Sequence, residues 1–265
     1  MSNITIQFMG TGSSFSKKHG NTSALVFVEK DGEVKKILID CGRTTPDDMA
    51  EHGYGFGDID AIFITHLHGD HVYGLEEAGF IGRYVLNKKP HLIFPSVKIK
   101  NDLWDKVLKG TMAQGDLVRA MSFEDYFTHE VVDREDQYFF FNDVMFSVFP
   151  TNHIKNKKSY GLIIGERNYI LYSGDSLFNN DLVGIGFSED CQAVFHDCQL
   201  FESDSKVHAS LGDLLTIDEQ YRGSVFIMHY GDDLHGNWDK IDEIKDSGLN
   251  IAIRGEKYEF EVGEF

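Results

Sequence analysis

The heptapeptide Thr65-His66-Leu67-His68-Gly69-Asp70-His71 is the most informative part of this chain. It directly follows the apolar run Ile59-Asp60-Ala61-Ile62-Phe63-Ile64, which is typical of a buried strand. Imidazole and carboxylate groups at the end of a buried strand cost free energy unless a partner compensates them. Both groups are ligands of zinc and related divalent metals, so the heptapeptide predicts a metal site. The alternative is a polar loop that merely happens to be rich in histidine, and it explains this density of ligand-type residues poorly.

Three later segments repeat this pattern, with an apolar strand followed by a ligand-type residue. They are Val148–His153, Tyr169–Asp175 and Val225–His229. A single buried strand that ends in a histidine is usually explained by packing in the core. Three such ends together with the heptapeptide instead predict one shared site at one edge of the sheets.

Coordination chemistry divides these residues between two metal ions. We expect a first ion to be bound by His66, His68 and His153. A second ion would be bound by Asp70, His71 and His229, and Asp175 would bridge the two ions. A water molecule between two such ions loses a proton near neutral pH and becomes a nucleophile. Asp70 is also placed to orient that water.

Length and composition narrow the classes of protein and partner. With 265 residues the chain can bury a full core, and we expect one α/β domain over residues 1–265. The net charge of −18 disfavours a large nucleic acid as partner, and the short basic cluster Lys155-Asn156-Lys157-Lys158 is typical of a solvated loop. The sequence contains no run of about 18 apolar residues, so we expect no membrane span. Three cysteines without paired spacing favour a reducing cytoplasm.

Strands and helices are expected in two groups, which is typical of a layered sandwich. The first group of strands ends with His91–Phe94, and the second begins at Gln137. Between them lies a different region, Val97–Thr128, in which Asn101–Leu108 and Gly115–Met121 have helical spacing. This insert is either a lid or interface, or a set of ordinary surface helices. A further helix is predicted over Ala209–Gln220.

The motifs resemble those of the metallo-β-lactamase-fold hydrolases over nearly the whole chain. The segment His66-Leu67-His68-Gly69-Asp70-His71 resembles that family's most specific motif, and the later ligands match in order: His153, Asp175 and His229. The resemblance implies a four-layer αββα sandwich with a binuclear site, usually zinc, at one edge. It also implies the division of ligands between the two ions given above.

Other segments resemble the ribonuclease Z branch. These are Phe8-Met9-Gly10-Thr11-Gly12, the turn from Asp40, and Phe195-His196-Asp197-Cys198. His208 falls where that branch carries a histidine that helps to protonate the leaving oxygen, and Asp197 is in turn expected to orient His208. Chemistry agrees, because a histidine beside two metals that is not itself a ligand suits a general acid. The alternative for His208 is a surface histidine near the start of a helix.

One departure from ribonuclease Z is informative. That group carries a long basic arm between the ligands that match His153 and Asp175, whereas here only a strand, a turn and a strand lie between them. The chain in this respect resembles the anti-Pycsar phosphodiesterases of phages and bacteria. That resemblance implies hydrolysis of cyclic mononucleotides, including cyclic CMP and cyclic UMP. It also implies a homodimer in which Val97–Thr128 lies over the partner's site, and action in the host cytoplasm if the chain is phage-encoded.

Three other functions remain open. A ribonuclease Z-type endonuclease that processes the 3′ ends of transfer RNA would need an RNA-binding surface that the sequence does not reveal. Hydrolysis of a lactone, thioester or β-lactam would not need the His208 segment. A protein that only sequesters a nucleotide would not need a complete set of ligands for an activated water.

Overall fold

The computed structural model describes residues 1–114, 119–132, 137–179, 188, 190–201 and 206–263. Its strands form two seven-stranded sheets. The first sheet has the order β14-β1-β2-β3-β4-β5-β6, with bounds Lys257–Val262, Ser2–Gly10, Ser23–Lys30, Glu33–Ile39, Ala61–Phe63, His91–Phe94 and Thr128–Val131. The second has the order β13-β12-β11-β10-β9-β8-β7, with bounds Asn250–Ile251, Val225–Met228, Cys191–Asp197, Tyr169–Tyr172, Ser159–Ile164, Val144–Thr151 and Tyr138–Phe141.

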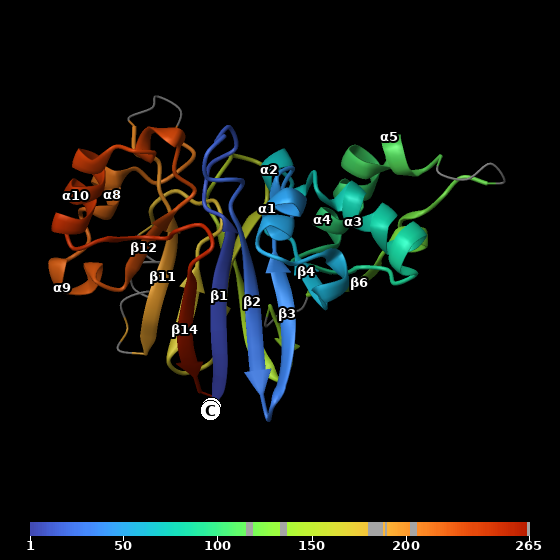
Figure 1. Cartoon of the computed structure of the whole chain (residues 1–265), viewed down its shortest axis with the longest axis horizontal. Helices are drawn as coiled ribbons and strands as arrows, with labels where there is room; N and C mark the ends of the chain where they lie inside the picture. Colours follow the sequence, from blue (N-terminus) through green and yellow to red (C-terminus); the bar gives the residue numbers. More distant parts are fainter. Residues whose placement is uncertain (115–118, 133–136, 180–187, 189, 202–205, 264–265) are drawn as a thin grey trace.

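The helices lie outside the sheets. In Figure 1, α3, α4 and α5 lie to one side of the strands and α8, α9 and α10 to the other. The α-helices are α1 (Thr45–Glu51), α2 (Gly69–Val72), α3 (Leu75–Ile81), α4 (Val97–Asp102), α5 (Lys109–Met112), α6 (Phe123–Tyr126), α8 (Leu211–Leu214), α9 (Glu219–Arg222) and α10 (Trp238–Asp246). Helices of other types are η1 (Phe56–Asp58), η2 (Gly82–Leu86), η3 (Leu103–Leu108) and η4 (Asp232–Leu234).

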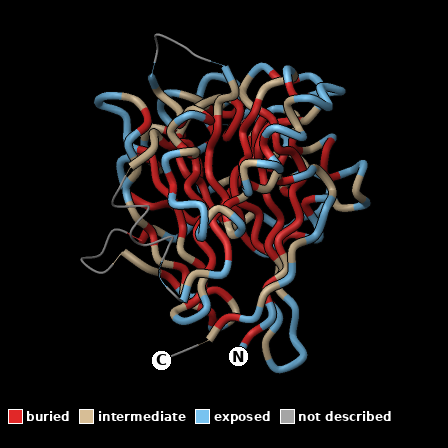
Figure 2. Tube along the Cα trace, turned by 90° about the vertical axis from the view of Figure 1, so that its left-hand side faces the viewer, coloured by how far each residue is buried: buried red, intermediate tan, exposed pale blue. Residues whose placement is uncertain are grey.

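Aromatic side chains from both sheets pack together between them. The rings of Phe8 in β1 and Phe195 in β11 have centroids 5.2 Å apart, and those of Phe63 in β4 and Phe139 in β7 are 5.7 Å apart. Figure 2 shows the buried residues running through the middle of the molecule, with exposed residues along its outside. Two packed sheets flanked by helices are the four-layer αββα sandwich that the sequence predicts.

The short strand β4 places the histidine-rich heptapeptide. All three of its residues are buried, and it pairs in parallel with β3 on one side and β5 on the other. A parallel strand covered on both faces has a continuous apolar sequence, as Ala61-Ile62-Phe63 does. The strand ends at Phe63, and the still buried Ile64 and Thr65 lead into the histidine-rich segment at the edge of the sandwich.

The insert predicted over Val97–Thr128 contains four helices in its described part, α4, η3, α5 and α6. Within the predicted helix Gly115–Met121, residues 115–118 lie outside the described residues, and 119–121 are not helical. The insert ends in a strand that the sequence patterns did not predict: β6 begins at Thr128 and pairs in parallel with β5.

The single helix predicted over Ala209–Gln220 is wrong. Two short helices, α8 and α9, take its place. Ser210 and Asp213 form a capping box that starts α8. The hydroxyl of Thr216 then donates to the carbonyl oxygen of Asp213 at 2.6 Å, and this local bond competes with continuation of the helix.

None of the helices in the described part of the chain combines the length and the apolar character that crossing a bilayer requires.

Candidate metal centre

The candidate site lies where several strands end. β10, β11 and β12 are parallel neighbours, with Tyr172 opposite Phe195 and Asp197 opposite Met228. Asp175 follows β10, Asp197 ends β11, and His229 follows β12. Adjacent strands are about 4.8 Å apart, so parallel pairing alone brings these three side chains to one edge of the sheet. The heptapeptide after β4 and His153 after β8 complete the site.

A first group of ligand-type atoms gathers around His68. Its Nδ1 lies 3.0 Å from Nε2 of His66 and 3.2 Å from Nε2 of His153. Oδ2 of Asp175 lies 3.6 Å from Nε2 of both His66 and His153. Each residue offers one ligand atom, and all of these atoms lie within 4.8 Å of one another, which suits a single divalent ion.

A second group gathers on the other side of Asp175. Its Oδ1 lies 3.3 Å from Nε2 of His71 and 3.5 Å from Nε2 of His229. Oδ2 of Asp70 lies 3.4 Å and 3.3 Å from the same two nitrogens. The two oxygens of Asp175 thus face two different groups of ligand-type residues. The structure brings together all seven residues predicted to bind metal, in the two sets that the sequence predicts.

The hydrogen bonding within these groups fits a divalent metal. Oδ2 of Asp175 and Nε2 of His71 are buried and make no hydrogen bond to any of the described residues. Buried polar atoms are almost always satisfied, so each such atom requires an explanation. Imidazole nitrogens and carboxylate oxygens crowded around a common point are the donor set of a zinc-type ion, and such an ion would satisfy both atoms.

Residues behind the ligand-type groups orient their rings. Nδ1 of His71 donates to Oδ2 of Asp40 at 2.7 Å, and Asp40 also accepts from the backbone nitrogen and the hydroxyl of Thr65 at 2.8 and 2.6 Å. Nδ1 of His153 donates to the carbonyl oxygen of Val207 at 2.6 Å. Each bond leaves Nε2 facing the candidate metal position, which is how outer partners fix a metal-binding histidine.

Asp40 is a site residue whose role as the hydrogen-bond acceptor for His71 was not predicted from the sequence patterns. The signal for it was present, because Asp40 follows the apolar end of β3 as the other candidates follow their own strands. Asp40 and His229 also share an uncommon backbone conformation, with φ of 61° at each. For a residue other than glycine this conformation is uncommon, and it tends to occur at functional sites.

Close backbone approach also shapes the heptapeptide. A Cβ atom at Gly42 would lie 1.9 Å from the carbonyl oxygen of Asp70. Only a residue without a side chain fits there, so glycine at position 42 allows the chain after β3 to pack directly against the heptapeptide.

The two groups differ in how they bind protons. Burial lowers the pKa of His66 well below its ordinary value and that of His68 to about 4, with the Lys157 ammonium adding to the effect on His68. Burial also disfavours the charged forms of His71 and His229. There, however, the Asp175 carboxylate and its neighbours outweigh burial and raise both pKa values well above the ordinary one. Burial also lowers the pKa of His153, so the three histidines of the first group favour the neutral form that binds a cation.

His208 and Asp197 form a pair at the mouth of the site. Nδ1 of His208 lies 2.6 Å from Oδ2 of Asp197, which also accepts from the backbone nitrogen of Ser176 at 3.0 Å. The His208 ring stacks on that of His229, with centroids 4.9 Å apart, and its side chain is 18 % exposed. A hollow of about 330 Å³ opens here, lined by Ser14, His68, Gly69, Asp70, His153, Ile154, Asp175, Val207, His208 and His229.

Solved structures share the fold of this chain. The metallo-β-lactamase fold protein YhfI from Bacillus subtilis matches with a TM-score of 0.73 at 14% identity, covering 97% of this chain and 99% of that one. A diphosphatase from the PhnP family matches with a TM-score of 0.73 at 20% identity, covering 98% of both chains. The short form of human tRNase Z matches with a TM-score of 0.64 at 19% identity, covering 98% and 100%. These matches confirm the predicted metallo-β-lactamase fold.

Sequence comparison identifies the family. The "Anti-Pycsar protein Apyc1" of Paenibacillus harenae is 38% identical over 227 residues, which cover 86% of this chain and 90% of the relative. The protein of the same name from Bacillus phage BSP38 is 33% identical over 261 residues, covering 96% and 97%. Residues 4–255 match the model of the family described as anti-Pycsar protein Apyc1. With this match extending over the strands and helices that build the candidate site, the chain belongs to the Apyc1 family of anti-Pycsar proteins.

Proposed function

We propose that this protein is a binuclear-metal phosphodiesterase that hydrolyses cyclic mononucleotides, including cyclic CMP and cyclic UMP, to linear nucleoside monophosphates. Residues 1–265 would form a single domain with this activity. In this role it would counteract cyclic-nucleotide defence signalling in the host cytoplasm. The main support is the position of Asp175, whose two oxygens face two separate sets of imidazole and carboxylate atoms. Membership of the anti-Pycsar family supports the biological role.

The proposed ligands follow from these two sets. One ion would be held by His66, His68 and His153, a second by Asp70, His71 and His229, with Asp175 shared between them. We propose zinc, because imidazole and carboxylate ligands suit it. When bound, such a pair of ions supplies an activated water and positive charge for the phosphodiester.

The chain's own residues complete the reaction. Asp70, at the opening of the site, would orient the attacking water. His208 would give a proton to the departing ribose oxygen, since a histidine is well suited to donate a proton near neutral pH. Asp197 would hold His208 in position through Nδ1, which leaves Nε2 as the proton donor. His208 belongs to neither of the two sets that share Asp175, so the proposal assigns it to proton transfer and not to metal binding.

A homodimer is part of the proposal. The segment Tyr84-Val85-Leu86, just before the insert, exposes three consecutive large apolar side chains at 56%, 75% and 40%. Clustered apolar exposure of this kind is typical of a protein–protein interface. We propose that this segment and the insert over Val97–Thr128 contact the partner subunit near its site.

Turnover after reconstitution with metal tests the proposal. The substrates are cyclic CMP, UMP, AMP and GMP, with precursor transfer RNA in parallel. We expect hydrolysis of the cyclic nucleotides, lost in Asp70→Ala and kept in Asp105→Ala, which removes an exposed carboxylate of η3. Cleavage of the RNA alone would instead show a ribonuclease Z-type transfer-RNA endonuclease.

A further inference from the structure

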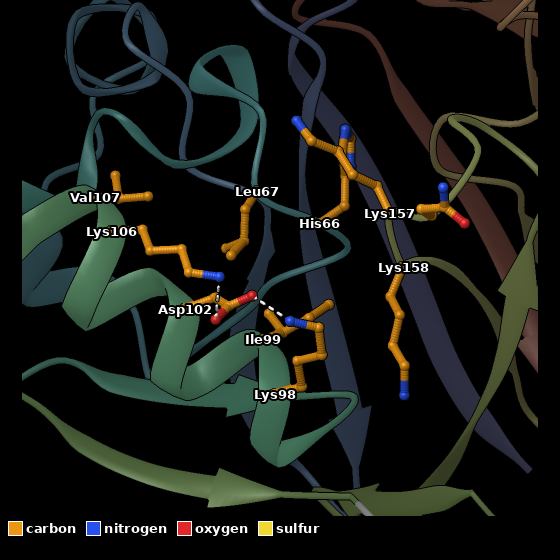
Figure 3. Close-up of a pocket in the computed structure, with 10 residues that line it drawn as sticks. His66, Leu67, Lys98, Ile99, Asp102, Lys106, Val107, Lys157 and Lys158 are labelled. Carbon is orange, nitrogen blue, oxygen red and sulfur yellow. Dashed lines mark hydrogen bonds and ion pairs between the residues drawn. The ribbon is translucent and has the colours of Figure 1, made fainter.

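A second cavity adjoins the candidate metal centre. It has a volume of about 310 Å³ and lies between α4 and η3 on one side and residues 156–158, in the loop after β8, on the other (Figure 3). His66 and Leu67 of the heptapeptide form part of its lining, so the cavity shares a residue with the first ligand group. Its volume is within the range of pockets that bind small molecules.

The lining combines an apolar surface with many hydrogen-bond donors. Leu67, Ile99 and Val107 supply the apolar part. Four lysines and one aspartate supply the charges, so the cavity is cationic in a chain whose net charge is −18: Lys98, Lys106, Lys157, Lys158 and Asp102. An apolar pocket with a few convergent polar groups is the usual form of a small-molecule site.

The lysines are positioned by identifiable contacts. Nζ of Lys98 and Nζ of Lys106 lie 2.6 and 2.8 Å from the two carboxylate oxygens of Asp102, as Figure 3 shows. An ammonium group has three donors, so each lysine keeps two for a ligand after this contact. Lys157 is close enough to the metal centre to lower the pKa of His68, after burial. Lys157 thus links the cavity to the first ligand group.

We propose that this cavity binds the nucleobase of the substrate, with its lysines donating hydrogen bonds to carbonyl oxygens of the base. This inference rests on the phosphodiesterase function proposed above. With the phosphodiester at the candidate metal centre, the flat faces of the base would contact Leu67, Ile99 and Val107. Uracil offers two exocyclic carbonyl oxygens, cytosine and guanine offer one each, and adenine offers only ring nitrogens as acceptors. The cavity therefore favours uracil and disfavours adenine.

A larger cavity elsewhere fits this role less well. It has a volume of about 750 Å³, lies beside α10, and includes Trp238 and Tyr258 in its lining. Its lining contains none of the seven candidate metal ligands, so it shares no lining residue with the metal centre. The cavity beside His66 shares one.

Two lysine substitutions with matched controls test the inference. Lys106→Met and Lys157→Met each remove a donor from the cavity. Lys109→Met and Lys155→Met remove the same charge from the neighbouring helix and from the same loop, but neither residue lines the cavity. The substrates are cyclic UMP, cyclic AMP and bis(p-nitrophenyl) phosphate, a phosphodiester without a base.

The expected results separate base binding from general attraction. Wild-type protein should hydrolyse cyclic UMP with a higher kcat/KM than cyclic AMP. Lys106→Met and Lys157→Met should each raise KM for cyclic UMP about three- to tenfold, as expected for loss of one hydrogen bond, with little change in kcat. KM for cyclic AMP and for bis(p-nitrophenyl) phosphate should stay nearly constant, and the two control variants should match wild type.

A variant that fills the cavity gives an independent measurement. Val107→Trp, on η3, should raise KM for every cyclic nucleotide and leave hydrolysis of bis(p-nitrophenyl) phosphate intact. Unchanged KM for cyclic UMP in the lysine variants and in Val107→Trp would overturn the base site and leave the phosphodiesterase function standing. Equal losses on the substrate without a base would also overturn it. Hydrolysis of bis(p-nitrophenyl) phosphate but of no cyclic nucleotide would overturn both proposals.

Discussion

Nδ1 of His208 donates a hydrogen bond of 2.6 Å to Oδ2 of Asp197, whose side chain is completely buried at the end of β11. Oδ1 of the same carboxylate lies 3.5 Å from Nδ1 of His229, a candidate metal ligand. One buried aspartate therefore binds the proposed proton donor and lies beside a proposed ligand. The position of His208 relative to the metal centre is set through this shared carboxylate.

Loss of the proposed proton donor should affect chemistry without affecting metal binding. We expect His208→Ala to lower kcat for cyclic nucleotides about 10²- to 10⁴-fold, the usual contribution of a positioned general acid. Metal content, measured by elemental analysis, should match wild type. His129→Ala, which removes an exposed histidine of β6, is the control and should keep full activity. Loss of metal in His208→Ala would show that His208 acts as a ligand instead.

The Asp197–His208 pair should behave as a unit. Asp197→Asn should lower kcat, because an amide cannot hold the imidazole as a carboxylate does. It should also weaken metal binding through His229. In the double variant with His208→Ala, we expect a loss of activity much smaller than the product of the two single losses, since residues acting together are not additive. Multiplicative losses would mean that the two residues act independently.

The carboxylate behind His71 should control metal affinity. Asp40 accepts hydrogen bonds from His71 and twice from Thr65. We expect Asp40→Asn to weaken metal binding about 10- to 100-fold, which is typical when the outer partner of a ligand is removed. Competition with a chelator measures this affinity. Asp47→Asn, at an exposed carboxylate in the first turn of α1, should bind metal as wild type does.

The close approach at Gly42 should not tolerate a methyl group. We expect Gly42→Ala to lower the free energy of unfolding by about 1–3 kcal/mol, as overpacking does, and to reduce metal content by displacing the backbone of Asp70. Gly110→Ala is the matched control, because a Cβ atom there meets nothing within 4 Å. This second change should be neutral or slightly stabilising, since alanine favours the helix. Equal stability of the two variants in urea unfolding would contradict the argument.

Metal binding near pH 7 should release protons. The facing carboxylates outweigh burial and hold the pKa values of His71 and His229 above their ordinary value, so we expect both imidazoles to carry protons before metal binds. Imidazole binds metal only when neutral, so protons must leave. Titration calorimetry in buffers of different ionisation enthalpy measures this release. Binding without proton release would contradict the raised pKa values.

Stability of the metal-free protein should follow the same pKa shifts. A histidine with a raised folded-state pKa stabilises the fold below its unfolded pKa of about 6.5, and this contribution is lost as pH rises through the folded value. His71 and His229 act in this direction. His68, with a pKa lowered to about 4 mainly by burial, acts in the other: the fold loses stability as pH falls from about 6.5 towards 4. Thermal melts with a chelator at several pH values measure both effects.

The clustering of the candidate ligand residues could be predicted from the sequence because each follows a run of apolar residues at the end of a strand. Parallel pairing of β10, β11 and β12 then brings residues distant in sequence to one edge. Side-chain hydrogen bonds that compete with the backbone are harder to predict, and the bond from Thr216 to Asp213 lies where the helix expected after Ala209 is divided.

The sequence patterns did not predict that the basic loop at residues 155–158 helps to line a cavity. Lys157 and Lys158 are typical of a solvated loop in sequence, and both are exposed in the structure. Only the packing of α4 and η3 across from them turns the same residues into one wall of a cavity. Because that packing joins segments about 50 residues apart, neither segment alone carries the signal.

The candidate ligands and the cavity walls are held by different kinds of structure. The ligands stand at strand ends, whose spacing is set by backbone pairing throughout two sheets. The cavity walls come from residues 156–158 and from the turns of α4 and η3, which belong to neither sheet. If the signal nucleotide acquired a different base, substitutions in this loop and in α4 and η3 would suffice to change which base the proposed cavity binds. The reaction centre would be inherited unchanged.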